Sequence, residues 1–298
     1  MYTRMLVPLD GSKIAENVLP YARNMAGALK VPVQLLGVIE MSHYTSGARA
    51  SYLDTLMDAA IRRNQEYLQS AAKTFLVSSV ECTVEGGVPQ EVIIAKAAEN
   101  RGTLIALATH GRSGLNRWLL GSVAEKVLRG ASNAVLLVRG TEEAKTEGEK
   151  APERVIVPLD GSQLAEAVMP IVLEVAKAIK LKVVLLRVYS APPIMYSIGH
   201  DDFLDDLNKI LAESKSEATS YLDNVANQLK SKGLADVIQI VSEGEAAENI
   251  IELARGAPNS LIVMCTHGYS GVKSWVLGSV AEKVVRHGGN PVLVIRGL

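Results

Sequence analysis

Residues 109–127 read THGRSGLNRWLLGSVAEKV, and residues 266–284 read THGYSGVKSWVLGSVAEKV. Fourteen of these nineteen aligned positions are identical, at an offset of 157. A second block, VPLDGS at residues 7–12, returns letter for letter at residues 157–162, at an offset of 150. Self-similarity on this scale indicates that the chain contains two copies of one structural unit in tandem.

A polar segment separates the two copies. The stretch GTEEAKTEGEKAPE has no apolar periodicity and is rich in Glu, Lys and Thr, which is typical of a linker. We therefore predict a first domain over residues 1–140, a linker over 141–152 and a second domain over 153–298. The difference between the two offsets predicts an insertion in the second copy between Val188 and Gly244.

The bulk composition excludes several classes of function. The 298 residues are 48% hydrophobic, which is enough for two domains with a core each. The net charge is −1 and aromatic residues make up 4%, so we expect no nucleic-acid partner. No run approaches the roughly 18 apolar residues of a membrane span, so we expect no membrane partner. The two cysteines, Cys82 and Cys265, lie in apolar stretches and predict reduced thiols in a cytoplasmic protein.

Short apolar runs alternate with longer helical patterns in each copy, which predicts an α/β fold. Runs such as LIALA and AVLLV are continuously apolar, as expected of strands that are buried on both faces of a sheet. The strands predicted in the first copy are residues 4–9, 33–39, 80–84, 103–108 and 134–139. The helices predicted there are residues 13–29, 51–76, 90–100 and 123–130. Pro20 lies inside the first of these helices and Pro170 repeats this in the second copy, so we expect a kink in each.

This alternation predicts two doubly wound, Rossmann-like domains, each with a five-stranded parallel sheet covered by helices on both faces. In such sheets a ligand binds beyond the carboxyl ends of the strands, where the strand order reverses.

The loop after the fourth strand carries the most informative binding signal. It runs from Gly111 to Gly121 and Ser122, where a helix is predicted to begin. A helix N-terminus offers unpaired N–H groups and a positive dipole, which suit a phosphate, and glycine lets an anion approach the backbone. The structural alternative is a capping box between Ser122 and Glu125, repeated in the second copy. A cap does not require the two glycines, however, and both copies contain them at the same spacing.

The first strand ends in the sequence PLDGS. Its aspartate, Asp10, could cap the following helix or accept hydrogen bonds from a ligand. Because Ser12 can supply the cap, we expect Asp10 to serve a ligand. The second strand ends near Val38, whose backbone groups could face the same crevice.

These features together resemble the universal stress protein family, over essentially the whole chain and twice. The resemblance rests on a strand that ends in Pro-x-Asp, a second strand that ends in an apolar-Val pair, and a Gly-x9-Gly-Ser loop that enters a helix. It implies the adenine nucleotide alpha hydrolase-like fold and binding of ATP or AMP, with or without Mg²⁺. In the first copy the implied ligand-binding residues are Pro8, Asp10 and Val38 for the adenine, and Gly111, Gly121, Ser122 and Val123 for ribose and phosphates. In the second copy they are Pro158, Asp160 and Val188, and Gly268, Gly278, Ser279 and Val280.

The two copies differ at positions that bear on the ligand. Family members that bind ATP carry Gly-x2-Gly-x9-Gly-Ser/Thr, but Ala108 and Cys265 stand at the first glycine of this pattern. A side chain there would crowd the ribose, and cysteine would do so more than alanine. Arg112 is replaced by Tyr269 in the second copy. If Arg112 reaches the phosphates, it strengthens the first site, so we predict that the first site binds ATP more tightly.

Sequence motifs leave three functions open. Neither GxxxxGK[ST] nor a GxGxxG after a strand occurs, and we predict no catalytic and no metal-ligating residue. The first hypothesis is a non-enzymatic stress-response regulator whose nucleotide state alters its interaction with an unidentified protein partner. The second is a slow Mg-dependent ATP hydrolase or phosphotransferase, and the third is a nucleotide-free, chaperone-like scaffold.

The last strand of each copy bears on assembly. Members of the family commonly dimerise through their last strands, so the resemblance implies that residues 134–139 and 291–296 pair within this chain as an intrachain pseudo-dimer. Both segments are apolar enough to be paired strands rather than exposed edges. Homodimerisation of the whole chain stays open.

Overall fold

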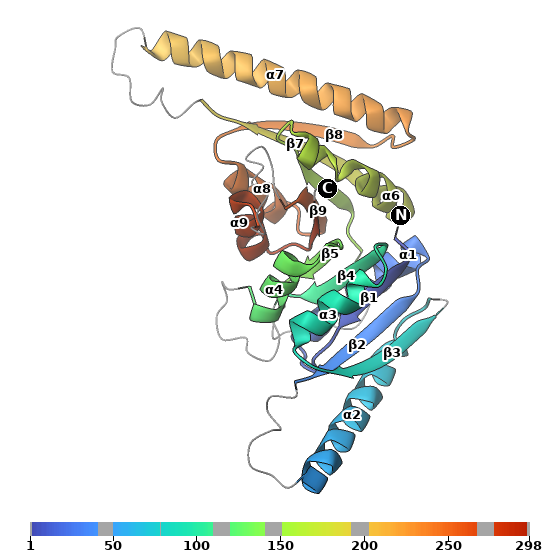
Figure 1. Ribbon diagram of the computed structural model, residues 1–298. Helices are drawn as coiled ribbons and strands as arrows, with labels where there is room; N and C mark the ends of the chain where they lie inside the picture. The colour runs from blue at the N-terminus through green and yellow to red at the C-terminus, as the bar shows by residue number, and fades with distance from the viewer. Residues whose placement is uncertain are drawn as a thin grey trace. The chain divides into compact units, whose positions relative to one another are not determined.

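The computed structural model describes residues 2–40, 50–77, 79–109, 120–140, 151–191, 203–266 and 277–296. Contacts divide the chain into two compact units (Figure 1). The first unit comprises residues 1–151, 274–277 and 291–296, and the second comprises residues 152–273, 278–290 and 297–298. Most of the predicted linker, residues 141–150, lies outside the described residues.

The first unit contains a doubly wound parallel sheet, as predicted. Its strands are β1 (Arg4–Pro8), β2 (Val33–Ile39), β3 (Val80–Gly86), β4 (Thr103–Ala108), β5 (Val135–Val138) and β10 (Val292–Ile295). Its helices are the 3-10 helix η1 (Ala15–Val18), α1 (Leu19–Leu29), α2 (Ala50–Ala72), α3 (Pro89–Ala98) and α4 (Ser122–Gly130). The strand order is β3-β2-β1-β4-β5-β10, and β1 to β5 are parallel. Right-handed crossovers place α1 and α2 on one face and α3 and α4 on the other.

The second unit repeats the arrangement of β1 to β4. Its strands are β6 (Arg154–Pro158), β7 (Lys182–Tyr189), β8 (Val237–Glu243) and β9 (Ser260–Cys265), all parallel, in the order β9-β6-β7-β8. Its helices are α5 (Gln163–Glu166), α6 (Met169–Ile179), α7 (Phe203–Ser231), α8 (Ala246–Arg255) and α9 (Ser279–His287). Helix α7 has 29 residues whereas α2 has 23, so it holds most of the predicted insertion. It runs alongside β7 and β8 (Figure 1).

Strand β10 belongs to the second copy in sequence but completes the sheet of the first unit. It pairs antiparallel with β5, with Leu293 opposite Leu136. These two side chains are 0% and 1% exposed. Beyond the strand, the Arg296 guanidinium donates to the Ala131 carbonyl at 3.0 Å. The last strands of the two copies therefore pair as the family resemblance implied, and β5 does not present an open edge.

The two prolines do not lie inside one continuous helix, where a kink was expected, but at the start of a second helix. Pro20 and Pro170 each stand in the first turn of a helix, because α1 begins at Leu19 and α6 at Met169. At this position the missing N–H has no intrahelical acceptor to lose, and the fixed φ of proline suits the helix. The residues that precede each proline fold as a separate short helix, η1 or α5.

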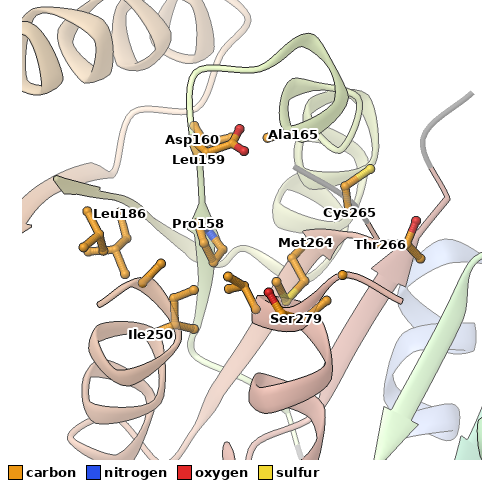
Figure 2. Close-up of a pocket in the computed structure, with 15 residues that line it drawn as sticks. Pro158, Leu159, Asp160, Ala165, Leu186, Ile250, Met264, Cys265, Thr266 and Ser279 are labelled. Carbon is orange, nitrogen blue, oxygen red and sulfur yellow. The ribbon is translucent and has the colours of Figure 1, made fainter. Parts of the chain in front are cut away.

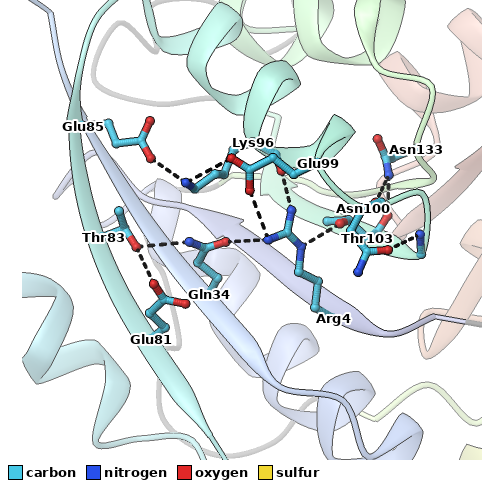
Figure 3. A network of polar contacts seen from close by, with 11 residues as sticks. Arg4, Gln34, Glu81, Thr83, Glu85, Lys96, Glu99, Asn100, Thr103 and Asn133 are labelled. Atoms are coloured by element: carbon cyan, nitrogen blue, oxygen red, sulfur yellow. Dashed lines mark hydrogen bonds and ion pairs between the residues drawn. The ribbon is translucent and has the colours of Figure 1, made fainter.

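A polar network joins the amino end of β1 to α3 in the first unit (Figure 3). The Arg4 guanidinium donates to Thr103 Oγ1 at 2.8 Å and to Gln34 Oε1 at 3.3 Å, and also to the carbonyl of Lys96. Thr103 and Gln34 are buried, so Arg4 satisfies side-chain acceptors that water does not reach. Lys96 pairs with Glu85 at 2.9 Å, and this hydrogen bond raises the pKa of Lys96 above its usual value.

We expect Arg4→Met to lower the free energy of unfolding of the first unit by about 2 kcal/mol, because buried acceptors lose their donor. Urea unfolding followed by hydrogen exchange in β1 and α3 measures the change. The matched control is Arg154→Met in the second unit, where Val184 replaces Gln34 as the neighbour on the adjacent strand. An equal loss of stability in the two variants would show that the network contributes nothing specific.

Candidate functional site

A pocket lies at the carboxyl ends of β6, β7 and β9 in the second unit (Figure 2). Its volume is about 300 Å³, at the lower end of the range of ligand-binding clefts. The strand order reverses between β6 and β9, so the pocket occupies the place where doubly wound sheets bind ligands. Its lining residues are Pro158, Leu159, Asp160, Ala165, Leu186, Val188, Ala246, Ile250, Met264, Cys265, Thr266, Gly278, Ser279, Val280 and Ala281.

The pocket gathers residues that sequence analysis had assigned to the second site. Six of the seven line it, namely Pro158, Asp160, Val188, Gly278, Ser279 and Val280. The seventh, Gly268, lies outside the described residues. Pro158, at the end of β6, lies between Leu186 of β7 and Met264 of β9 (Figure 2). The topology thus brings these residues together, while their contact with a ligand stays a prediction.

The first unit places the corresponding residues on the corresponding elements. Pro8 ends β1, Asp10 follows it, and Val38 lies near the end of β2. The remaining described residues, Gly121, Ser122 and Val123, form the start of α4. Gly111 and Arg112 lie outside the described residues, so the contribution of the Arg112 cation stays a prediction.

The aspartate at each strand end forms part of a tight turn. Asp160 Oδ1 accepts from the Ser162 amide at 3.0 Å and from the Ser162 hydroxyl at 2.6 Å. Ser162 Oγ accepts from the Ala165 amide at 3.1 Å and caps α5. Between them, Gly161 has φ +80°, a conformation that favours glycine.

The first unit repeats this turn around Asp10, with distances of 2.9, 2.6 and 3.1 Å for the same three bonds. Ser12 Oγ accepts from the Ala15 amide at the start of η1, but the N-cap of η1 is Ile14 and has no side-chain cap. The aspartate uses one oxygen to hold the turn, so it is not reserved for a ligand. This corrects the simpler picture in which the serine holds the turn and the aspartate serves only the ligand.

The capping box proposed as the structural alternative is not formed. Gly278 is the N-cap of α9 and Ser279 is its first residue, and no side chain caps the helix. Gly121 and Ser122 have the same places in α4. A capping hydroxyl must belong to the residue before the helix, so these serines are one position too late. Ser279 instead stands at the wall of the pocket.

The backbone at the start of α9 also lines the pocket. Gly278 N–H donates to the Thr266 carbonyl at 2.8 Å and closes the loop between β9 and α9. The next three residues, Ser279 to Ala281, line the pocket, and amides in a first helical turn have no intrahelical acceptor. This arrangement suits an anionic group, because N–H donors and the positive end of the helix dipole coincide there.

An ion pair connects α8 and α9, which form one wall of the pocket. Glu245 caps α8 by accepting from the Glu248 amide at 2.9 Å, and it pairs with Lys283 of α9 at 3.1 Å. The amide hydrogen bond, supported by the Lys283 ammonium, lowers the pKa of Glu245 below its usual value. The Glu245 carboxylate is therefore charged at neutral pH, and it connects the start of α8 to α9.

Cys265 stands in the pocket of the second unit at the position where the family pattern has its first glycine. It ends β9, is 7% exposed and lines the pocket beside Met264 and Thr266 (Figure 2). Its counterpart Ala108 ends β4 and is 9% exposed. The thiol thus stands where crowding of the ligand was predicted, and the size of that effect stays a prediction.

The described part of the chain contains neither a cluster of metal-ligating side chains nor a helix long and apolar enough to span a membrane. Within it, no three His, Cys, Asp or Glu side chains gather as a metal site. Asp160 is the one carboxylate among the described residues that line the pocket. None of the helices in the described ranges combines the length and the hydropathy of a membrane span.

The fold and the pocket define a tandem of two α/β domains with a ligand crevice at the strand ends. The family model of the universal stress protein family matches residues 1–139 and 152–296. The chain therefore belongs to the universal stress protein family, as the sequence resemblance indicated.

Some similar proteins extend over both copies and others match a single copy. The chain is 24% identical over 307 residues to universal stress protein Rv2623 of Mycobacterium tuberculosis, covering 98% of this chain and 96% of that protein. It is 29% identical over 141 residues to universal stress protein MJ0531 of Methanocaldococcus jannaschii, covering 47% and 83%. A crystal structure of a universal stress protein from Archaeoglobus fulgidus superposes with a TM-score of 0.70 at 20% identity, covering 99% of this chain and 98% of that one. This last likeness supports the fold of both units.

Proposed function

We propose that this protein binds an adenine nucleotide, ATP or AMP, in each unit and acts as a non-enzymatic cytoplasmic regulator in a stress response. The observation that carries the proposal is the pocket of the second unit, where the residues implied by the family pattern line one cavity. The bound nucleotide would shift the protein between states that differ in affinity for a partner protein, since a ligand biases an equilibrium only by its differential affinity.

Different parts of the pocket suit the base and the phosphate of an adenine nucleotide. Pro158, Leu186 and Ile250 provide apolar walls for a purine, and Asp160 provides an acceptor at the strand end. The first turn of α9, from Ser279 onward, provides donors for a phosphate. Mg²⁺ is proposed only as a companion of the triphosphate, because Mg²⁺ in nucleotide sites is held largely by phosphate oxygens and water.

The test is to denature the purified full chain by heat, identify any released nucleotide, and then titrate nucleotide-free protein with ATP by calorimetry. We expect two binding events. Gly121→Leu should remove one and Gly278→Leu the other, because a bulky side chain would occupy each helix entrance. We expect the event lost in Gly121→Leu to be the tighter one, because the first unit carries Arg112 and has Ala108 in place of Cys265.

The other hypotheses give distinct results in the same experiment. Steady turnover of labelled ATP that disappears in Gly121→Leu would indicate a hydrolase or phosphotransferase. Protein that releases no nucleotide and shows no heat on titration would refute nucleotide binding and indicate a scaffold.

A further inference from the structure

Arg187 reaches from β7 to the turn that carries Asp160. Its guanidinium donates to the Leu159 carbonyl at 3.4 Å. A Cβ built on Gly161 would lie 3.2 Å from Arg187 Nη1, so the guanidinium packs against the backbone of that glycine. The guanidinium therefore contacts the main chain on both sides of Asp160. The neighbours of Arg187 along β7, Leu186 and Val188, line the pocket, whereas side-chain alternation turns Arg187 to the other face of the sheet.

Tyr221 of α7 connects this contact to the helix layer. The Arg187 guanidinium carbon lies 5.5 Å from the centroid of the Tyr221 ring, within the range of a cation–π interaction. The Tyr221 hydroxyl donates to Glu166 Oε1 at 2.9 Å, and Glu166 is the last residue of α5. Burial, reinforced by this hydrogen bond, raises the pKa of Tyr221 well above its usual value, so the phenol remains a donor. We refer to Arg187, Tyr221 and Glu166 together as the clamp.

The first unit has the same turn but lacks the arginine of the clamp. The residue aligned with Arg187 is Gly37, whereas the pair Tyr67-Leu68 of α2 matches the pair Tyr221-Leu222 of α7. The two units therefore share the aspartate turn and differ in what supports it from the sheet face opposite the pocket.

We propose that Arg187 is a positioning residue for the nucleotide site of the second unit. Through the clamp, it holds the Asp160 turn in the conformation that receives the ligand. The inference rests on the proposed function, because the ligand is the adenine nucleotide proposed there. Fixing a binding loop before the ligand arrives raises affinity, since less conformational freedom is lost on binding.

The first test compares affinities of the second site in the full chain, with the first site as an internal control. Arg187→Met removes the donors but keeps side-chain bulk on the strand, and Tyr221→Leu removes both the aromatic ring and the hydroxyl. We expect each variant to weaken binding of AMP and ATP at the second site about tenfold, which corresponds to about 1.4 kcal/mol. Arg187→Lys should recover only part of the affinity, because an ammonium lacks the planar fork of the guanidinium.

The comparison between the two ligands separates positioning from direct contact. The clamp acts on the aspartate end of the site, so AMP and ATP should lose the same factor. A loss that is clearly larger for ATP would mean that Arg187 contacts the phosphates, and it would overturn the positioning role. Unchanged affinity for both ligands in Arg187→Met would overturn it as well.

The second test needs no ligand. Hydrogen exchange in the nucleotide-free protein compares the amides of Ser162 and Ala165 with those of Ser12 and Ala15, which make the same bonds in the first unit. We expect slower exchange in the second unit, and exchange at the rate of the first unit in Arg187→Met. Equal rates in the two units of the unmodified protein would contradict the clamp.

These readouts also distinguish the clamp from the proposed function. If the unmodified second site binds no nucleotide, the proposed function of that site fails and this inference fails with it, even where exchange is slow. If nucleotide binds but neither affinity nor exchange changes in Arg187→Met, only the clamp fails.

Discussion

Asp160→Asn is expected to weaken AMP and ATP binding in the second unit about 30-fold to 150-fold, because a charged hydrogen bond to the ligand is worth about 2–3 kcal/mol. The substitution keeps an oxygen for Oδ1, which accepts from the amide and hydroxyl of Ser162. The turn should therefore survive. The negative charge is lost, and the second carboxylate oxygen becomes an NH₂ donor that would oppose donors on the base. Calorimetric titration of the full chain measures the effect.

The matched control is Asp10→Asn, which makes the same change in the first unit, where the turn has nearly the same geometry. It should weaken the first binding event and leave the second unchanged. If the double variant Asp10→Asn and Asp160→Asn bound nucleotide with full affinity at both sites, the aspartates would not contact the ligand. The assignment of the adenine end of the site would then be wrong.

Leu293→Ala is expected to lower the free energy of unfolding of the first unit by about 2–5 kcal/mol, although Leu293 belongs to the second copy in sequence. The side chain is fully buried opposite Leu136 where β10 pairs with β5. Truncation removes buried apolar surface and leaves a cavity. Urea unfolding combined with hydrogen exchange of the β5 amides measures the loss in the first unit specifically.

The control is Leu76→Ala, since Leu76 is 90% exposed and the same truncation there should change stability by less than about 0.5 kcal/mol. If Leu293→Ala left the exchange of β5 unchanged, the pairing of β5 with β10 would not contribute to the stability of the first unit.

The elements that were predicted well are those that a continuous apolar pattern specifies. The predicted strands at residues 33–39 and 103–108 match β2 and β4 to the residue, because each run is largely apolar and is followed by a polar residue, Glu40 or Thr109. Helix starts were predicted less well. The pattern continues through Pro20, and only the three-dimensional path shows that α1 begins immediately before it.

The residues of the candidate site also fall into those that could be predicted from the sequence and those that could not. The residues at strand ends and at the start of α9 could be predicted, because the topology of a parallel sheet brings carboxyl ends together. Ala246 and Ile250 of α8 were missed, because periodicity shows that a helix has an apolar face but not which residues reach a pocket. Arg187 was missed too. A signal existed, however, since its counterpart is Gly37, and so large a difference between otherwise similar copies marks a position worth inspecting.

Strand β10 completes the sheet of the first unit but comes from the second copy, and this has a consequence for how the protein is synthesised. A ribosome adds roughly 5–20 residues per second, and β10 follows β5 at an offset of 157, so it is synthesised roughly 8–30 s later. Throughout that interval the nascent first unit displays the bare, apolar edge of β5. Two chains growing on one messenger could pair through that edge, so translational pausing between residues 152 and 290 is expected to increase misassembly, and chaperones that shield nascent strands are expected to suppress it.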